Sequence, residues 1–238
     1  MKRSLLGLGL VMACWFWQGV AAAGQVAVYR DPNRGDLTIE MSDSGMARVS
    51  TGMPSQYLIM RDDSAYLVGA ESDGSTSVMQ LETVAQAIGK VLGTELATLF
   101  HKVGDAVGKT KLTVKPTGRT ESIAGYSGEI YEVFGLDESN PKQPVVFVMS
   151  KAPELKPVGL AYQRFMESTM VMAAPLFGPA VTGMIGEMRQ VFALGVPLKS
   201  EGKFELISVQ PKDFADSYFD LPAAPMNLEQ VQARIVQK

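Results

Sequence analysis

Residues 168–186 read STMVMAAPLFGPAVTGMIG and contain no charged side chain. A run of about this length is what a membrane-spanning helix requires. Two features argue against a span. Pro175 and Pro179 lie inside the run and would break an isolated helix, and both flanking residues are glutamates where a span is usually anchored by basic residues. We therefore predict two amphipathic helices that join at Ala174–Pro179.

The two predicted helices are rich in methionine, which is flexible and fills irregular gaps in a core. Methionine is also frequent on surfaces that bind variable apolar partners, so two interpretations stay open: a gap-filled core, or an adaptable apolar pocket between these helices and a sheet. The methionines concerned are Met166, Met170, Met172, Met184 and Met188.

A third helix is predicted upstream, between Glu82 and Val107. Its apolar residues recur in steps of three and four, which is the period of one helix face. Gly89 and Gly93 each weaken a helix by about 1 kcal/mol relative to alanine, so this helix needs packing support or breaks there. His101, the single histidine of the chain, is interpreted as a partly exposed residue of this helix. The apolar positions are Val84, Ile88, Leu92, Leu96, Leu99, Val103 and Val107.

Short strands are predicted on both sides of this helix, because apolar and polar residues alternate in short segments separated by polar turns. Asp43-Ser44-Gly45 and Asp62-Asp63-Ser64 are typical of hairpin turns. The regular spacing indicates an antiparallel meander, not alternating strands and helices. The predicted strands are Gln25–Tyr29, Leu37–Met41, Met46–Ser50, Tyr57–Arg61, Tyr66–Val68, Ser77–Leu81 and Lys111–Lys115, with further strand segments between 117 and 151.

The N-terminus has the layout of a secretory signal. Basic residues Lys2 and Arg3 precede an apolar run too short for a comfortable span, and small residues end it at Ala23. We predict a signal peptide at residues 1–23, cleavage after Ala23, a periplasmic protein and a single domain at 24–238. In the minor alternative, the lipobox-like VMAC segment leads to a lipoprotein anchored at Cys14.

Composition restricts the chemistry. Cys14 is the only cysteine, so a chain without the signal has no disulfide, no thiolate metal site and no nucleophilic thiol. The net charge is −3 and no basic patch with interleaved aromatics is present, which argues against nucleic acid as a partner. No motif of a serine hydrolase, zinc protease or phosphate loop occurs. We therefore expect no enzyme activity, cofactor or metal; a hydrolase based on paired carboxylates remains a third hypothesis, because such residues need only meet in space.

Three phrases resemble a known family: MARVSTGMPSQYLIMRDDSAYLVGAESDGSTSVMQL at 46–81, TGRTESIAGYSGEIYEV at 117–133 and SYFDLPAA at 217–224. They look like the bacterial family called domain of unknown function 4412, which is similar to periplasmic lipoprotein carriers of the LolA/LolB type. The resemblance implies an α+β fold: a curved antiparallel sheet, an unclosed half-barrel, with amphipathic helices on its concave face. It brings no catalytic residue.

Pattern and resemblance together predict an exported, non-enzymatic protein that binds or carries a lipid-like or other apolar ligand in the periplasm. The alternative is an envelope interaction or structural module with a packed core and no ligand. The expected partners are an apolar small molecule or lipid, or an envelope protein, with no membrane-spanning segment in the mature chain. The hypothetical apolar pocket is formed by Leu92, Leu96, Leu99, Met166, Met170, Met184 and Met188.

Overall fold

The structure is a computed structural model that describes residues 24–236 apart from 54, 72, 94–110, 137–139 and 179. The predicted signal peptide with Cys14, the second half of the predicted upstream helix, and His101 lie outside the described residues. The strands are β1 Gly24–Asp31, β2 Gly35–Ser42, β3 Ala47–Ser50, β4 Gln56–Arg61, β5 Ser64–Ala70, β6 Thr76–Gln80, β7 Thr113–Ile123, β8 Tyr126–Phe134, β9 Val145–Ser150, β10 Val196–Ser200 and β11 Phe204–Pro211.

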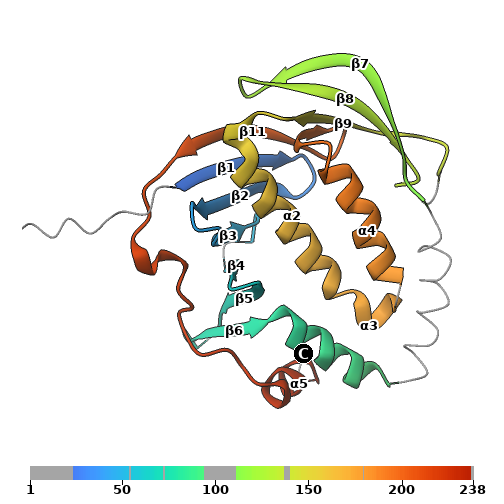
Figure 1. Cartoon of the computed structure of the whole chain (residues 1–238). Coiled ribbons are helices and arrows are strands. Elements are labelled where there is room, and N and C mark those ends of the chain that lie inside the picture. The colour runs from blue at the N-terminus through green and yellow to red at the C-terminus, as the bar shows by residue number, and fades with distance from the viewer. Residues whose placement is uncertain are drawn as a thin grey trace, which may run out of the picture.

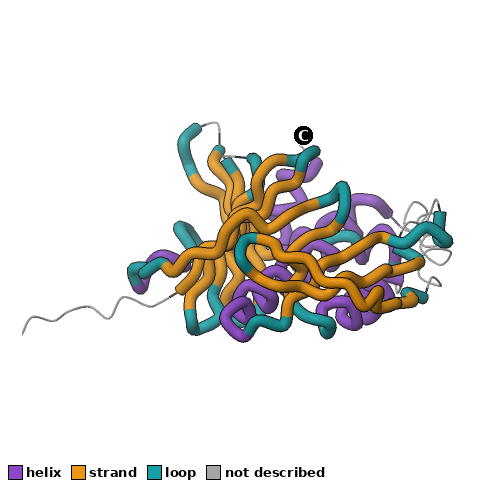
Figure 2. The backbone as a smooth tube through the Cα atoms, turned by 90° about the horizontal axis from the view of Figure 1, so that it is seen from above, coloured by secondary structure: helices purple, strands orange, loops and turns teal. Residues whose placement is uncertain are grey.

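These strands form one 11-stranded antiparallel sheet in the order β6-β5-β4-β3-β2-β1-β11-β10-β9-β8-β7. Strands β1 to β6 are one meander and β7 to β11 are another. The first strand of the chain pairs with the last, from Gln25 opposite Pro211 to Arg30 opposite Glu205, and this pairing joins the two meanders. Strands β6 and β7 end the order, so the sheet is open, and it wraps around the helices (Figures 1 and 2).

The curvature has a local cause. The pairing shifts register between Val28 and Tyr29 in β1 and between Pro197 and Lys199 in β10, close to the middle of the sheet. Such bulges bend a strand and increase its twist. A proline in a central strand is tolerated only at an irregularity of this kind, because it cannot donate to the ladder. Pro197 lies at one, so the sequence of β10 itself favours a bend there.

Three α-helices lie between β9 and β10 in the described chain: α2 Lys156–Val171, α3 Ala174–Phe177 and α4 Ala180–Phe192. They lie on the concave side of the sheet, together with a helix at residues 81–93 (Figure 1). Helix α2 comes very close to β10, because a Cβ atom at Gly159 would lie 2.6 Å from Cγ2 of Val196. The predicted fold class, a curved open antiparallel sheet with helices on its concave face, is confirmed.

The apolar run at 168–186 is divided as the prolines predict. Helix α2 ends at Val171, and α3 spans only Ala174–Phe177. Gly178 then has a φ of 59°, which interrupts the helical geometry before α4. Within the described ranges, no helix combines the length and the apolar character needed to cross a membrane.

The main core lies between α2 and the concave face of the sheet. Buried residues Val158, Ala161 and Tyr162 of α2 meet strand residues from both meanders. Each Å² of apolar surface buried here contributes about 25 cal/mol to folding. The strand residues of this core that are at most 2 % exposed are Ala27, Tyr29, Ile39, Met41, Ala47, Val49, Met60, Ala65, Val148, Leu198 and Leu206.

A C-terminal segment, residues 212–227, covers the opposite face of the first meander; we call it the strap. Alternate residues of a strand point to opposite faces, so Ile59, Val68 and Val78 point away from α2. Leu221 and Ala223 of the strap pack on these three side chains. The strap leads into α5, Leu228–Val236, at the bottom of Figure 1.

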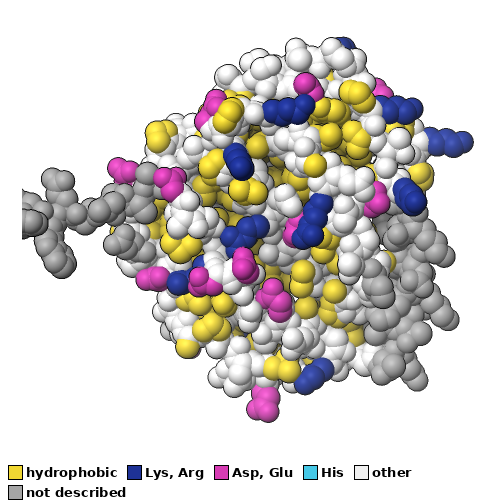
Figure 3. Space-filling view, in the orientation of Figure 1, with side chains coloured by type: hydrophobic (Ala, Val, Ile, Leu, Met, Phe, Trp, Pro, Cys, Tyr) yellow, Lys and Arg dark blue, Asp and Glu magenta, His cyan; other side chains and the backbone are white. Residues whose placement is uncertain are grey.

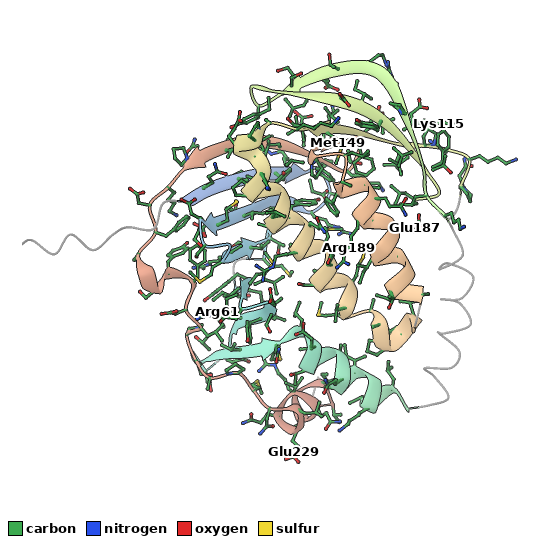
Figure 4. All side chains as sticks on the ribbon, viewed as in Figure 1. Arg61, Lys115, Met149, Glu187, Arg189 and Glu229 are labelled. Atoms are coloured by element: carbon green, nitrogen blue, oxygen red, sulfur yellow. The ribbon has the colours of Figure 1, made fainter. Side chains whose placement is uncertain are left out.

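Polar contacts fix the strap. The carboxylate of Glu40, which is only 9 % exposed, accepts hydrogen bonds from Lys212 Nζ at 2.7 Å and from the Tyr218 hydroxyl at 2.6 Å. Burial and the bond to Glu40 raise the pKa of Tyr218 to about 12, so its phenol stays protonated and donates at neutral pH. Arg61, labelled in Figure 4, donates to Asp220 of the strap at 2.9 Å.

Two elements differ from the sequence prediction. The hairpin of β10 and β11 was not predicted, although it lies at the centre of the sheet. The upstream helix begins at residue 81, one residue before the predicted start, and is described to residue 93. Gly93 has a φ of 69°, the left-handed geometry that glycine adopts readily.

We expect Gly195→Ala to destabilise the fold by about 3 kcal/mol or more, because it combines backbone strain with a clash. Gly195 has a φ of 142°, and a Cβ there would lie 2.3 Å from the carbonyl oxygen of Ser150. Gly202→Ala is the control: its φ is 69° but nothing lies within 4 Å of the added atom, so strain alone should cost about 1 kcal/mol. Urea unfolding of both variants measures the difference, and equal losses would contradict the assigned clash.

Candidate functional site

A pocket of about 510 Å³ lies between α2, α4 and the strands β9, β10 and β11. Hydrophobic side chains gather in this upper part of the molecule, with Lys and Arg side chains around them (Figure 3), and Met149 of β9 is labelled there in Figure 4. The pocket is lined by Leu136, Val145, Phe147, Met149, Tyr162, Met166, Met188, Val191, Phe192, Pro197, Ser200, Lys203 and Phe204.

The sheet side of the pocket is set by strand register. Ser200 of β10 pairs with Phe147 of β9 and with Phe204 of β11, so the three side chains lie in one row on the concave face. Tyr162 of α2 faces this row, with its ring centroid 5.6 Å from that of Phe204 and 6.0 Å from that of Phe192. Four aromatic residues therefore frame the pocket from both layers.

Few polar groups reach the pocket. Ser200 is 2 % exposed, and its hydroxyl oxygen has no hydrogen-bond partner among the described residues. Lys203 is exposed in the turn between β10 and β11. Burial, assisted by the nearby carboxylate of Asp31, raises the pKa of Tyr162, so its phenol is neutral throughout the physiological range.

An ion pair braces the two helices that form the other wall. Arg189 of α4 donates from Nε and Nη2 to the two carboxylate oxygens of Glu167 on α2, at 2.8 and 2.6 Å, and Gln163 donates to the same carboxylate at 2.7 Å. The hydrogen bonds from Arg189 hold the pKa of Glu167 below its usual value. Glu187, also labelled in Figure 4, accepts from the backbone N–H of Leu112 at 3.0 Å and ties α4 to the start of the second meander.

Two of the seven residues predicted for the apolar pocket line the pocket described above. Met166 of α2 and Met188 of α4 line the pocket. Met170 and Met184 are partly buried on the same helices but are not among its lining residues, and Leu92 is partly buried on the helix at 81–93. Leu96 and Leu99 lie outside the described residues. A ligand-binding role for these seven residues stays a prediction.

Most of the pocket wall was not predicted from the sequence. Phe192 lies on a helix that was predicted, and Phe147 on a strand segment that was predicted, but neither was assigned to a site. Ser200, Lys203 and Phe204 belong to the hairpin that was not predicted at all. The signal available in the sequence was the polar segment Glu201-Gly202-Lys203, which is followed by Phe204 and Leu206 in alternation. In the structure this segment is the turn, with a φ of 69° at Gly202, and Leu206 is buried.

The part of the chain that the structure describes contains no group of three or more His, Cys, Asp or Glu side chains placed to hold a metal ion. Asp62 and Asp63 have φ values of 47° and 59° and form the two-residue turn between β4 and β5. Positive φ at both positions is the geometry of a tight hairpin, which accounts for this acidic pair structurally.

Comparison with known proteins gives little guidance. No protein-family model matches the chain, so the resemblance to domain of unknown function 4412 is not supported. No curated protein is similar enough to count as a match. A solved structure with some likeness is the LolA superfamily protein NE2245 from Nitrosomonas europaea, at 16% identity over 56% of this chain and 60% of that chain, with a TM-score of 0.18. The fold class rests on the strand order described above.

We expect Glu167→Gln to lower the thermal unfolding midpoint by a few degrees at neutral pH, because it removes the charge that Arg189 contacts. The lowered pKa of Glu167 means that this carboxylate stabilises the fold above its ordinary value of about 4.3 and loses the effect as the pH falls through the lowered value. The difference between the two proteins should therefore be largest at neutral pH and shrink below about pH 4. Thermal unfolding at several pH values measures it; a difference independent of pH would contradict the assignment.

Proposed function

We propose that this protein is an exported, non-enzymatic binding protein that holds a lipid-like or other apolar ligand between α2, α4 and the strands β9 to β11. The observation that carries the proposal is the pocket of about 510 Å³. Small-molecule sites commonly measure about 300 to 1,000 Å³ and are lined mainly by apolar and aromatic side chains with a few polar groups. The pocket described here has that size and that lining.

The nature of the lining favours a variable apolar ligand. Met149, Met166 and Met188 contribute flexible, polarizable side chains from three different elements. Such side chains adapt to ligands of different shape at low cost. The rigid aromatic rings of Tyr162 and Phe204 provide the opposite property, a fixed surface against which an apolar chain packs.

The absence of acids from the wall argues against the carboxylate hydrolase. None of the residues that line the described pocket is Asp or Glu. Hydrolysis by paired carboxylates needs two such groups on either side of the bond that breaks. We therefore propose a binding protein without enzyme activity, with no cofactor.

The proposed location is the periplasm, with residues 1–23 as a cleaved signal peptide and 24–238 as one domain. In support of a single domain, both halves of the sheet share one main core beneath α2. The form anchored at Cys14 remains the alternative, and mass measurement of the exported protein separates the two.

The binding proposal is tested with the full chain, exported by a bacterium and purified from its periplasm. Titration with the fluorescent apolar probe N-phenyl-1-naphthylamine is expected to give saturable binding. Met188→Trp fills the pocket and should weaken probe binding by about tenfold or more, since an overfilled site must shift its neighbours. Gln190→Trp is the matched control on the same helix, at an exposed position outside the pocket lining, and it should bind as the unchanged protein does.

Failure of the unchanged protein to bind the probe, or equal binding by both tryptophan variants, would contradict the proposal. The envelope interaction module without a ligand would then be the better description. Circular dichroism of both variants verifies that each retains the fold, so that a loss of binding reports on the pocket.

A further inference from the structure

One hydroxyl in the pocket wall is unsatisfied. Ser200 is 2 % exposed, and its oxygen lacks a hydrogen-bond partner in the described part of the chain. A buried hydroxyl left without a partner is unfavourable, so a native structure retains one where something else supplies the partner. The row in which Ser200 lies, between Phe147 and Phe204, lines the pocket. A ligand in the pocket is the partner that this position fits.

A cation stands at the same end of the pocket. Lys203 lines the pocket with Ser200, and its backbone N–H donates to the carbonyl oxygen of Ser200 at 2.9 Å, which fixes the turn that carries both residues. The neighbouring Lys199 forms ion pairs with Glu121 at 2.9 Å and with Glu205 at 3.5 Å. None of the ion pairs found among the described residues involves Lys203.

Apart from the Tyr162 phenol, the remaining wall is apolar. Leu136, Val145, Met166 and Met188 contribute no hydrogen-bonding group, so the polar and apolar parts of the pocket are separated. Resting on the proposed function, we propose that the ligand is a long-chain carboxylate: its carboxylate lies at the Ser200 hydroxyl and the Lys203 ammonium, and its hydrocarbon chain lies among the methionines and aromatic rings of α2 and α4.

Neighbouring charges are compatible with an anion at this position. Asp31 is the carboxylate close to Tyr162, and it already accepts backbone N–H bonds from Asn33 at 2.8 Å and Arg34 at 3.1 Å. A second pocket of about 340 Å³ shares Ser200 and Lys203 and is lined also by Arg30 and Lys199, with one acid, Glu205. Arg30 is paired with Asp36, and Lys199 with Glu121 and Glu205, so Lys203 is the cation at this end that no ion pair among the described residues engages.

The test compares two amphiphiles with the same chain, dodecanoate and 1-dodecanol, by calorimetric titration of the full exported protein. We expect the unchanged protein to bind the acid more tightly. Lys203→Gln should weaken dodecanoate binding by about three- to tenfold and leave dodecanol binding unchanged. Added salt should reduce the preference of the unchanged protein for dodecanoate over dodecanol. Lys90→Gln, at an exposed lysine on the helix at 81–93, is the matched control and should bind both compounds as the unchanged protein does.

Ser200→Ala provides an independent readout. Like Lys203→Gln, it should weaken dodecanoate binding. It should leave the thermal unfolding midpoint of the ligand-free protein unchanged or slightly raised, because the ligand-free protein loses no hydrogen bond. A clear fall in the ligand-free midpoint would show that the hydroxyl has a structural partner and would overturn its assignment to the ligand.

Two further outcomes would overturn the proposal. Equal affinity of the unchanged protein for acid and alcohol, or the same response to Lys203→Gln and Lys90→Gln, would remove the carboxylate from this end of the pocket while leaving apolar binding intact. If neither amphiphile binds and the fluorescent probe also fails, the proposed function fails together with this inference.

Discussion

The antiparallel pairing of β1 with β11 holds the molecule together. Each meander forms from neighbouring segments, but only this pairing makes them one sheet. Helix α2 covers the junction: Tyr29 of β1, Phe204 of β11 and Tyr162 of α2 form one aromatic contact, with ring centroids 5.1 to 5.8 Å apart. The pocket lies beside this contact and the strap lies on the other face, so both depend on the same junction.

The elements that could be predicted from sequence are those with local patterns. Alternation and tight turns were sufficient for the first meander, and the two prolines at 175 and 179 were sufficient to divide the long apolar run. The β10–β11 hairpin was not recognised because Val196, Pro197 and Leu198 are all buried, so alternation is lost. The bulge at Pro197 causes this: it changes the register with β9, and a short proline-containing run resembles a loop.

The candidate site shows a second physical limit. A helical period identifies which face of a helix is apolar, but it does not locate the point along the axis where a space opens. Met166 and Met170 are four residues apart on α2, and Met184 and Met188 are four apart on α4, so each pair shares one face. Only Met166 and Met188 reach the pocket. The decisive information is the position of β9 to β11 opposite them, which depends on contacts between distant parts of the chain.

The order of the strands has a consequence for how the chain acquires its structure. During synthesis β1 emerges first among the strands, and its outer partner β11 emerges last, about 180 residues later, a separation that slows the closing of contacts between distant segments. Until then β1 is an edge strand whose free N–H and C=O groups are open to pairing with other chains. Completion of the sheet therefore requires the chain through β11, and a chain interrupted before β11 exposes the very strand on which the finished sheet is centred.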